Sequence, residues 1–124
     1  MIGLSTAAEV RAAERPVLAA GPPGALMQRA ATGLATVCLR LLGSPYGRRV
    51  VVLAGSGGNG GDALFAGVRL ARRGAQVTAV LLAPDRAHAG GRAALRRAGG
   101  REVPARDAAD RTARADLVLD GILG

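Results

Sequence analysis

Apolar residues recur along the chain in two alternating patterns, one typical of buried strands and the other of amphipathic helices. Short runs rich in valine, leucine and alanine occupy residues 49–54, 76–82 and 116–119, and a weaker run covers 102–104. Their shortness and continuity favour parallel strands that are covered on both faces. Between them, apolar positions spaced three and four residues apart predict helices at 25–42, 63–73, 87–98 and 107–113. Gly90-Gly91 is expected to interrupt the third of these helices.

One strand–turn–helix unit organises the rest of the chain. After the strand at 49–54 comes a turn, Gly55-Ser56-Gly57-Gly58-Asn59-Gly60-Gly61-Asp62, with five glycines in eight positions. The helix behind it ends at Gly74, where a residue following a helix must accept positive φ. A strand that turns tightly into a helix presents free backbone N–H groups and the positive end of the helix dipole. The turn therefore suits a phosphate group.

The first forty residues are helical in pattern. Thr6 and Glu9 have the spacing of a capping box, and the first helix is expected to end near Leu18, before the Gly-Pro-Pro-Gly break at 21–24. In the second helix the 3.6-residue period selects a buried stripe of Leu26, Ala30, Leu34, Val37 and Leu41. The whole pattern predicts an α/β, Rossmann-like three-layer fold with a mostly parallel sheet, preceded by two N-terminal helices.

Composition narrows the function classes. The net charge is +8, and all 17 basic residues are arginines. They are scattered over every predicted helix, which favours solvated helix faces and disfavours a nucleic-acid surface. Cys38, alone among apolar neighbours, is expected to be a small buried residue, and His88 a solvated surface residue. The sequence shows no membrane span and no signal peptide, so a cytoplasmic protein is expected.

Candidate ligand residues follow two of the predicted strands. Ligands bind beyond the carboxyl ends of parallel strands, and here those ends carry the glycine turn and Asp120. Gly55-x-Gly57-x-x-Gly60 also matches the dinucleotide fingerprint, with Asp85 as a candidate ribose-binding carboxylate. An NAD(P)-dependent oxidoreductase domain is therefore one alternative. A non-catalytic phosphate- or RNA-binding module is another, which the arginines would suit.

Four segments carry a more specific resemblance. Residues 54–62 (AGSGGNGGD) closely resemble the AGxGNNGGDG signature of the NAD(P)H-hydrate epimerase family, the YjeF N-terminal domain. Residues 116–124 (DLVLDGILG) resemble that family's DLVVDALFG segment. Residues 4–11 and 23–30 are similar to its two opening helices. The resemblance covers essentially the whole chain, with the four motifs in the family's order.

The resemblance implies an isomerase that interconverts the R and S forms of hydrated NADH and NADPH, NAD(P)HX, in cofactor repair. It implies one bound K⁺, held by Asn59 and Asp120, a homodimer, and a partner dehydratase that is often fused at the C-terminus. Two departures from the family pattern are Gly58, where the signature has Asn, and Gln28, where a Glu is usual. The substrate-binding residues that it implies are Gly58, Asn59, Gly60, Gly61, Asp62 and Gly124.

The family's catalytic Asp and a further K⁺ ligand belong to a D-x-PSG segment that would lie beyond Gly124. Residues 1–124 are therefore expected to be the N-terminal part of one such domain, incomplete at the C-terminus. No catalytic residue is expected in this chain, and these 124 residues alone are expected to be inactive.

Overall fold

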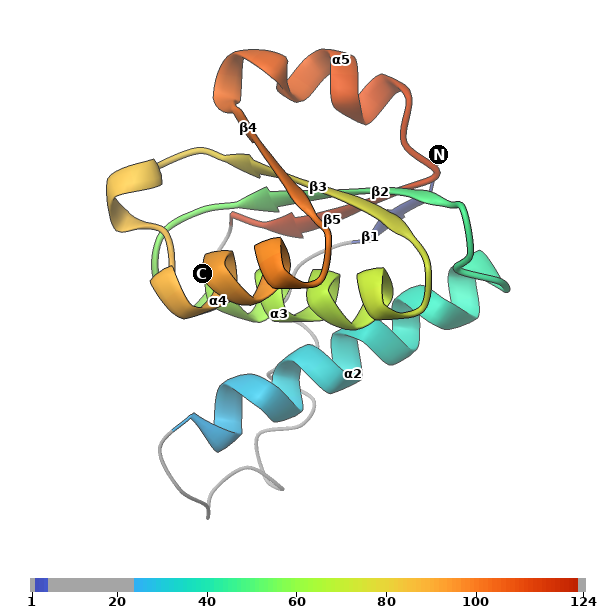
Figure 1. The fold of residues 1–124 in the computed structure, drawn as a ribbon, viewed down its shortest axis with the longest axis horizontal. Helices are drawn as coiled ribbons and strands as arrows, with labels where there is room; N and C mark the ends of the chain where they lie inside the picture. Colours follow the sequence, from blue (N-terminus) through green and yellow to red (C-terminus); the bar gives the residue numbers. More distant parts are fainter. Residues whose placement is uncertain (1, 5–23, 123–124) are drawn as a thin grey trace.

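The computed structural model describes residues 2–4 and 24–122, which form a parallel sheet with helices on both faces (Figure 1). Its strands are β1 (Ile2–Leu4), β2 (Arg49–Ala54), β3 (Gln76–Leu81), β4 (Arg101–Pro104) and β5 (Leu117–Gly121). Its α-helices are α2 (Ala25–Leu42), α3 (Gly57–Arg72), α4 (Ala89–Arg97) and α5 (Ala108–Ala113), with short 3₁₀ turns η2 (Pro84–Arg86) and η3 (Ala105–Asp107). The predicted α/β fold with a mostly parallel sheet is confirmed.

The strand order, β1-β5-β2-β3-β4, places a change of direction between β2 and β5. From β2 the chain moves outward through β3 to β4, and α5 then carries it back to β5 on the other side of β2. All described strand pairs are parallel, and Leu53 and Ala54 lie opposite Asp120 and Gly121. Ligands of open parallel sheets bind where the strand order reverses. Here that point lies between the glycine turn and Asp120.

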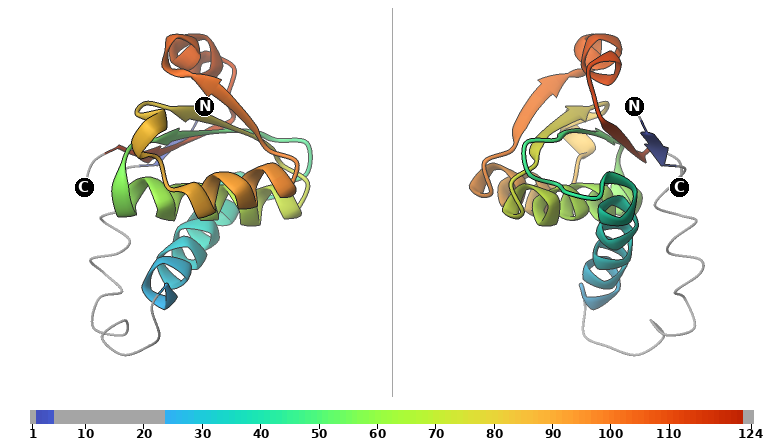
Figure 2. Two further views of the ribbon diagram at one scale, coloured as in Figure 1. Left: turned by 60° about the vertical axis from the view of Figure 1, so that its left-hand side comes forward. Right: turned by 90° about the vertical axis from the view of Figure 1, so that its right-hand side faces the viewer.

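The two faces of the sheet are covered unequally (Figure 2). Helices α3 and α4 cover one face, and α2 packs on α3 from outside. The larger apolar cluster fills this side, and it is built mainly from leucine, valine and alanine, including Leu34, Leu64, Leu95 and Leu117. On the opposite face the short helix α5 is the one described helix, and it covers a small cluster around Val51, Val80 and Ala115.

The bounds of α2 match the prediction, but its buried stripe matches only in part. Ala30 and Leu34 are buried as predicted, whereas Leu26 and Leu41 are 54% and 42% exposed. The other buried residues of the helix are Ala31, Ala35, Cys38 and Leu42. The helix is apolar on more than one side, so its periodicity alone could not decide which side packs. It packs against another helix and not against the sheet, and small residues allow the close approach that this contact needs.

Two further predictions need correction. Ile2–Leu4 is not helical; its backbone pairs in parallel with the outer edge of β5, whose polar groups would otherwise lack a strand partner on that side. Gly90-Gly91 does not interrupt α4, because the helix begins at Ala89 and the pair lies in its first turn. The capping box at Thr6 and Glu9 and the helix end near Leu18 lie outside the described residues. None of the helices in the described part of the chain is long and apolar enough to cross a membrane.

Candidate functional site

The connection between β2 and α3 is shorter than the sequence predicts. Only Gly55 and Ser56 separate the two elements, since α3 already begins at Gly57. Gly57 has φ of +74°, which an L-residue with a side chain rarely adopts. The prediction of an eight-residue turn is therefore wrong, because most of its glycines are helical. Glycine disfavours a helix interior by only about 1 kcal/mol, which packing can outweigh.

Three glycines bring the ends of β2 and β5 into contact with the first turns of α3. A Cβ atom on Gly60 would overlap the carbonyl oxygen of Gly55. A Cβ atom on Gly121 would lie 3.0 Å from the carbonyl oxygen of Leu53 and 3.2 Å from that of Asn59. The backbone N–H of Gly55 also donates to the carbonyl of Gly121 (3.2 Å). The glycines of this motif therefore serve packing as well as any ligand.

The predicted substrate residues occupy different positions in α3. Gly58 is exposed, whereas Asn59 and Asp62 are only 4% and 1% exposed, and Gly60 and Gly61 are buried. Gly61 lies against α2, since a Cβ atom there would be 2.9 Å from the sulfur of Met27. Gly124 lies outside the described residues. The five glycine-turn residues thus form one short helical segment, of which only Gly58 is open to solvent.

Asp62 lies too far along α3 to act as a helix-start carboxylate. With α3 beginning at Gly57, it falls in the second turn, and the first turn has no acidic residue. Asp62 therefore gains little from the helix dipole, because that effect fades within one turn. Asp62 is instead buried on the side of α3 that packs against the rest of the fold.

The free N–H groups lie earlier than the sequence indicated. A helix leaves about its first four N–H groups without intrahelical acceptors. With Ser56 as N-cap, three of these positions are Ser56, Gly57 and Gly58. Ser56 and Gly57, which the predicted substrate-binding residues do not include, are both exposed at this end of the helix. The signal that could have found them is the strand end at Ala54, after which a short connection leaves Ser56 as the natural N-cap.

Asp120 belongs to β5 and does not follow it. It is half-buried, and its Oδ1 atom accepts a hydrogen bond from the backbone N–H of Ile122 (2.9 Å). Its neighbour Gly121 is packed against the carbonyl of Asn59. Asn59 and Asp120 therefore lie at the same edge of the sheet, one on each side of the point where the strand order reverses.

This pair offers the donor types that suit a hard monovalent cation. An amide oxygen and a carboxylate are hard oxygen ligands, and one of the two side chains is shielded from solvent. Within the described ranges, by contrast, no group of three or more His, Cys, Asp and Glu side chains could hold a metal ion. Asn59 and Asp120 therefore fit a hard monovalent cation in the type of their donor atoms.

His88 is not the solvated surface residue that the sequence predicts. It is the N-cap of α4, and its Nδ1 atom accepts a hydrogen bond from the backbone N–H of Gly91 (2.9 Å). Its half-buried ring meets Phe65 edge-on, with centroids 5.6 Å apart. It also lies beside Gly61, where a Cβ atom would be 3.1 Å from the ring. His88 therefore joins the start of α4 to α3.

The segment after β3 forms a short 3₁₀ turn that holds Asp85. Asp85 is exposed in η2, beyond the end of β3. The segment is fixed by Arg92, which donates to both carboxylate oxygens of Glu102 (2.8 and 3.2 Å) and to the carbonyl of Pro84 (3.3 Å). This hydrogen bonding lowers the pKa of Glu102 and raises that of Arg92.

Cys38 is buried in α2, as predicted. Burial raises the pKa of its thiol to about 12. A thiol in this state is neutral at physiological pH and is a poor nucleophile. It serves as a small apolar side chain in the contact between α2 and α3.

Comparison with known proteins places these features in a family. The family described as "YjeF-related protein N-terminus" matches residues 23–124. The chain belongs to this family. It is 53% identical over 119 residues to the bifunctional NAD(P)H-hydrate repair enzyme Nnr of Mycobacterium tuberculosis, covering 93% of this chain and 24% of that protein. It is 48% identical over 119 residues to the NAD(P)H-hydrate epimerase of Microbacterium testaceum, covering 96% of this chain and 45% of that protein.

The chain thus spans between a quarter and half of the length of these relatives. Among solved structures, it resembles yeast ynu0 with a TM-score of 0.71 and 19% identity, over 98% of this chain and 57% of that one. Glutamyl-tRNA reductase from Methanopyrus kandleri is also similar, with a TM-score of 0.53 and 23% identity over 98% of this chain and 30% of that one. These structural likenesses show a shared α/β fold.

Proposed function

We propose that the chain forms the N-terminal part of an NAD(P)H-hydrate epimerase, an isomerase that interconverts the two forms of NAD(P)HX. One observation carries the proposal: the first turn of α3, with Asn59, meets the end of β5, with Asp120, where the strand order reverses. The two relatives compared above, an NAD(P)H-hydrate repair enzyme and an NAD(P)H-hydrate epimerase, support this activity by their names.

The backbone of α3 would bind a phosphate of the substrate. The N–H groups of residues 56–58 lie at the start of the helix, where the helix dipole favours an anion. Glycines at 57 and 58 let a ligand approach the backbone closely. Gly60, Gly61 and Asp62 are buried, so in this proposal they support the binding turn from behind.

Asn59 and Asp120 would hold one K⁺. The ion would supply a fixed positive charge beside the bound substrate. Asp120 keeps its Oδ2 atom for this role while its Oδ1 atom accepts the N–H of Ile122. The hydrogen bond orients the carboxylate, which reduces the entropy lost on binding an ion.

The rest of the proposal follows from the family. The group that moves the proton would be an Asp beyond Gly124, and Gly124 would open the next substrate-contacting segment. The partner would be an NAD(P)H-hydrate dehydratase, which the word bifunctional in the mycobacterial relative's name supports. The protein would be a cytoplasmic homodimer, and the exposed Leu26 and Leu41 on α2 offer an apolar surface for a second copy.

The dinucleotide alternative has less support. Its acidic residue should stand at the end of the second strand of the unit, within reach of a ribose bound at the glycine turn. Asp85 instead lies in the exposed turn η2, past the end of β3.

The decisive assay uses the complete protein with mixed NADHX epimers and a dehydratase that consumes only one of them, with and without K⁺. The protein is expected to accelerate the interconversion of the epimers, and the rate should be higher with K⁺ than without it. Asn59→Ala and Asp120→Ala should each remove the K⁺ dependence. Asp110→Ala, which removes an exposed carboxylate on α5, is the matched control and should keep it. An absence of acceleration in both salts would refute the epimerase proposal, and unchanged K⁺ dependence in both variants would refute the ligand assignment.

A further inference from the structure

A polar cavity lies at the other end of the strands from the glycine turn. It has a volume of about 260 Å³ and opens over the amino-terminal ends of β2 and β3, beneath α5. Its lining includes Arg49, Val51, Gln76, Thr78, Arg111 and Arg114. The site proposed above uses none of these residues.

The floor of this cavity follows from the strand register. Arg49 lies opposite Gln76, and Val51 lies opposite Thr78. Side chains alternate between the faces of a strand, so these four residues project from the same face. Val51 packs in the small apolar cluster beneath α5, which identifies that face. The sheet therefore presents an arginine, an amide and a hydroxyl side by side next to an apolar support.

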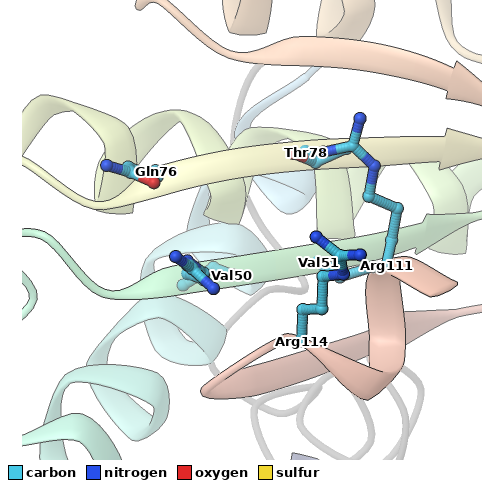
Figure 3. A pocket seen from close by; sticks show the side chains of 7 residues that line it. Val50, Val51, Gln76, Thr78, Arg111 and Arg114 are labelled. Atoms are coloured by element: carbon cyan, nitrogen blue, oxygen red, sulfur yellow. The ribbon is translucent and has the colours of Figure 1, made fainter.

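Helix α5 adds two more arginines above this floor. Ala108, at its start, and Ala115, two residues past its end, pack in the same cluster as Val51, and their small side chains keep the helix close to the sheet. Arg111 and Arg114 are three positions apart and so share one side of the helix. Figure 3 shows both side chains reaching from α5 across β2, with the guanidinium group of Arg111 beside Thr78 and that of Arg114 near Val51.

The charge in the cavity is one-sided. Among the described residues that line it, three carry a guanidinium group and none carries a carboxylate. Two acidic residues lie nearby. Asp110 meets Arg114 at 3.3 Å, with both side chains more than 60% exposed, and Asp116 accepts the backbone N–H of Arg49 at 2.8 Å. Three guanidinium groups against two nearby carboxylates leave this cavity with a net positive charge.

We propose that this cavity binds the phosphate group of a small phosphorylated ligand. Guanidinium groups bind phosphate through paired, charge-assisted hydrogen bonds, and Gln76 and Thr78 add neutral donors. The volume is slightly below the range of about 300–1,000 Å³ that is typical of small-molecule pockets. It suits a phosphate with a small attached group better than a dinucleotide. The inference does not depend on the epimerase proposal, because the two sites lie at opposite ends of the same strands.

The test is an NMR titration of the chain with inorganic phosphate and with adenosine monophosphate, at an ionic strength held constant with chloride. Saturable shifts of the arginine Nε–H signals are expected, and tighter binding of the monophosphate would identify an organic ligand. Equal affinity would identify the phosphate group alone as the ligand. The backbone amides of Gly57 and Gly58 report binding at the glycine turn separately in the same spectra.

Substitutions distinguish binding at this cavity from nonspecific attraction of phosphate by the net charge of +8. Arg111→Gln and Arg49→Gln should each weaken binding at the arginine signals about tenfold, the loss of one hydrogen bond to a charged group. Arg72→Gln removes an exposed arginine at the end of α3 and should change the phosphate affinity of the cavity by less than about twofold. Arg111→Lys keeps the charge and tests the paired geometry, and it should also weaken binding. Shifts that do not saturate, or equal weakening by Arg72→Gln and Arg111→Gln, would overturn the proposal.

Discussion

Replacing Gly60 by alanine should destabilise the fold and displace the start of α3. The added methyl group would overlap the carbonyl oxygen of Gly55, and the carbon of that carbonyl would be 2.9 Å from it. Both atoms belong to the backbone, so no side-chain rotation can relieve the overlap. The first turn of α3 must move away from the end of β2, and Asn59 moves with it.

The size of the effect follows from two opposing terms. Overpacking a tight site costs about 1–3 kcal/mol, and a backbone neighbour places Gly60 near the upper end. Alanine regains about 1 kcal/mol of helix propensity relative to glycine. The net loss should therefore be about 2 kcal/mol, which for a chain of 124 residues lowers the Tm by about 8 °C.

Gly58→Ala is the matched control, because it makes the same substitution two positions earlier in the same helix. Gly58 is exposed, so the propensity term should dominate and stability should rise by up to about 1 kcal/mol. Urea unfolding followed by circular dichroism measures both variants. Equal stability of the two variants, or a Gly60→Ala variant as stable as the parent, would refute the argument that Gly60 is required by backbone contact.

Three further outcomes test other parts of the structure. Leu34→Ala should lower the free energy of unfolding, measured in urea, by about 3 kcal/mol, and Leu26→Ala should lower it by less than about 0.5 kcal/mol. A larger loss for Leu26→Ala would mean that Leu26 is buried, as the sequence predicts, and would contradict the structure. The thiol of Cys38, with a pKa of about 12, should resist a thiol reagent at pH 8 until urea unfolds the chain; rapid reaction of the folded protein would contradict its burial. Glu102→Gln should cost about 1 kcal/mol at pH 7. Because the pKa of Glu102 is lowered on folding, its contribution is present above the unfolded pKa of about 4.3 and is lost as pH falls through the folded pKa, so the parent and variant should converge there.

Strands and helices with one clear pattern could be predicted from the sequence. The bounds of β2 and α2 match because a short apolar run and a long periodic segment each have a single reading. The buried side of α2 could not be predicted, since Leu26 and Leu34 both follow the helical period. Only the position of α3 decides between them, and that is a property of the assembled fold.

The sequence predicts the edge of the sheet that carries the candidate site, but not the local structure of that edge. The rule that ligands bind at the carboxyl ends of strands selects the edge that carries Asn59 and Asp120. The start of α3 was misplaced because the low helix propensity of glycine suggested a long turn. Propensity is a local quantity, whereas the close contact of Gly60 with Gly55 and of Gly121 with Asn59 joins segments that the sequence alone does not align.

Glycine is therefore required at different positions of this motif for different physical reasons. Gly57 is required by its positive φ, and Gly55, Gly60 and Gly121 by the close approach of backbone to backbone. Gly58 has neither requirement: it is helical, exposed and absent from the described glycines with positive φ. It is also the position at which the family signature has an asparagine. A side chain can thus be accommodated at position 58, whereas a Cβ atom on Gly60 or Gly121 would meet backbone atoms where the sheet and the helix join.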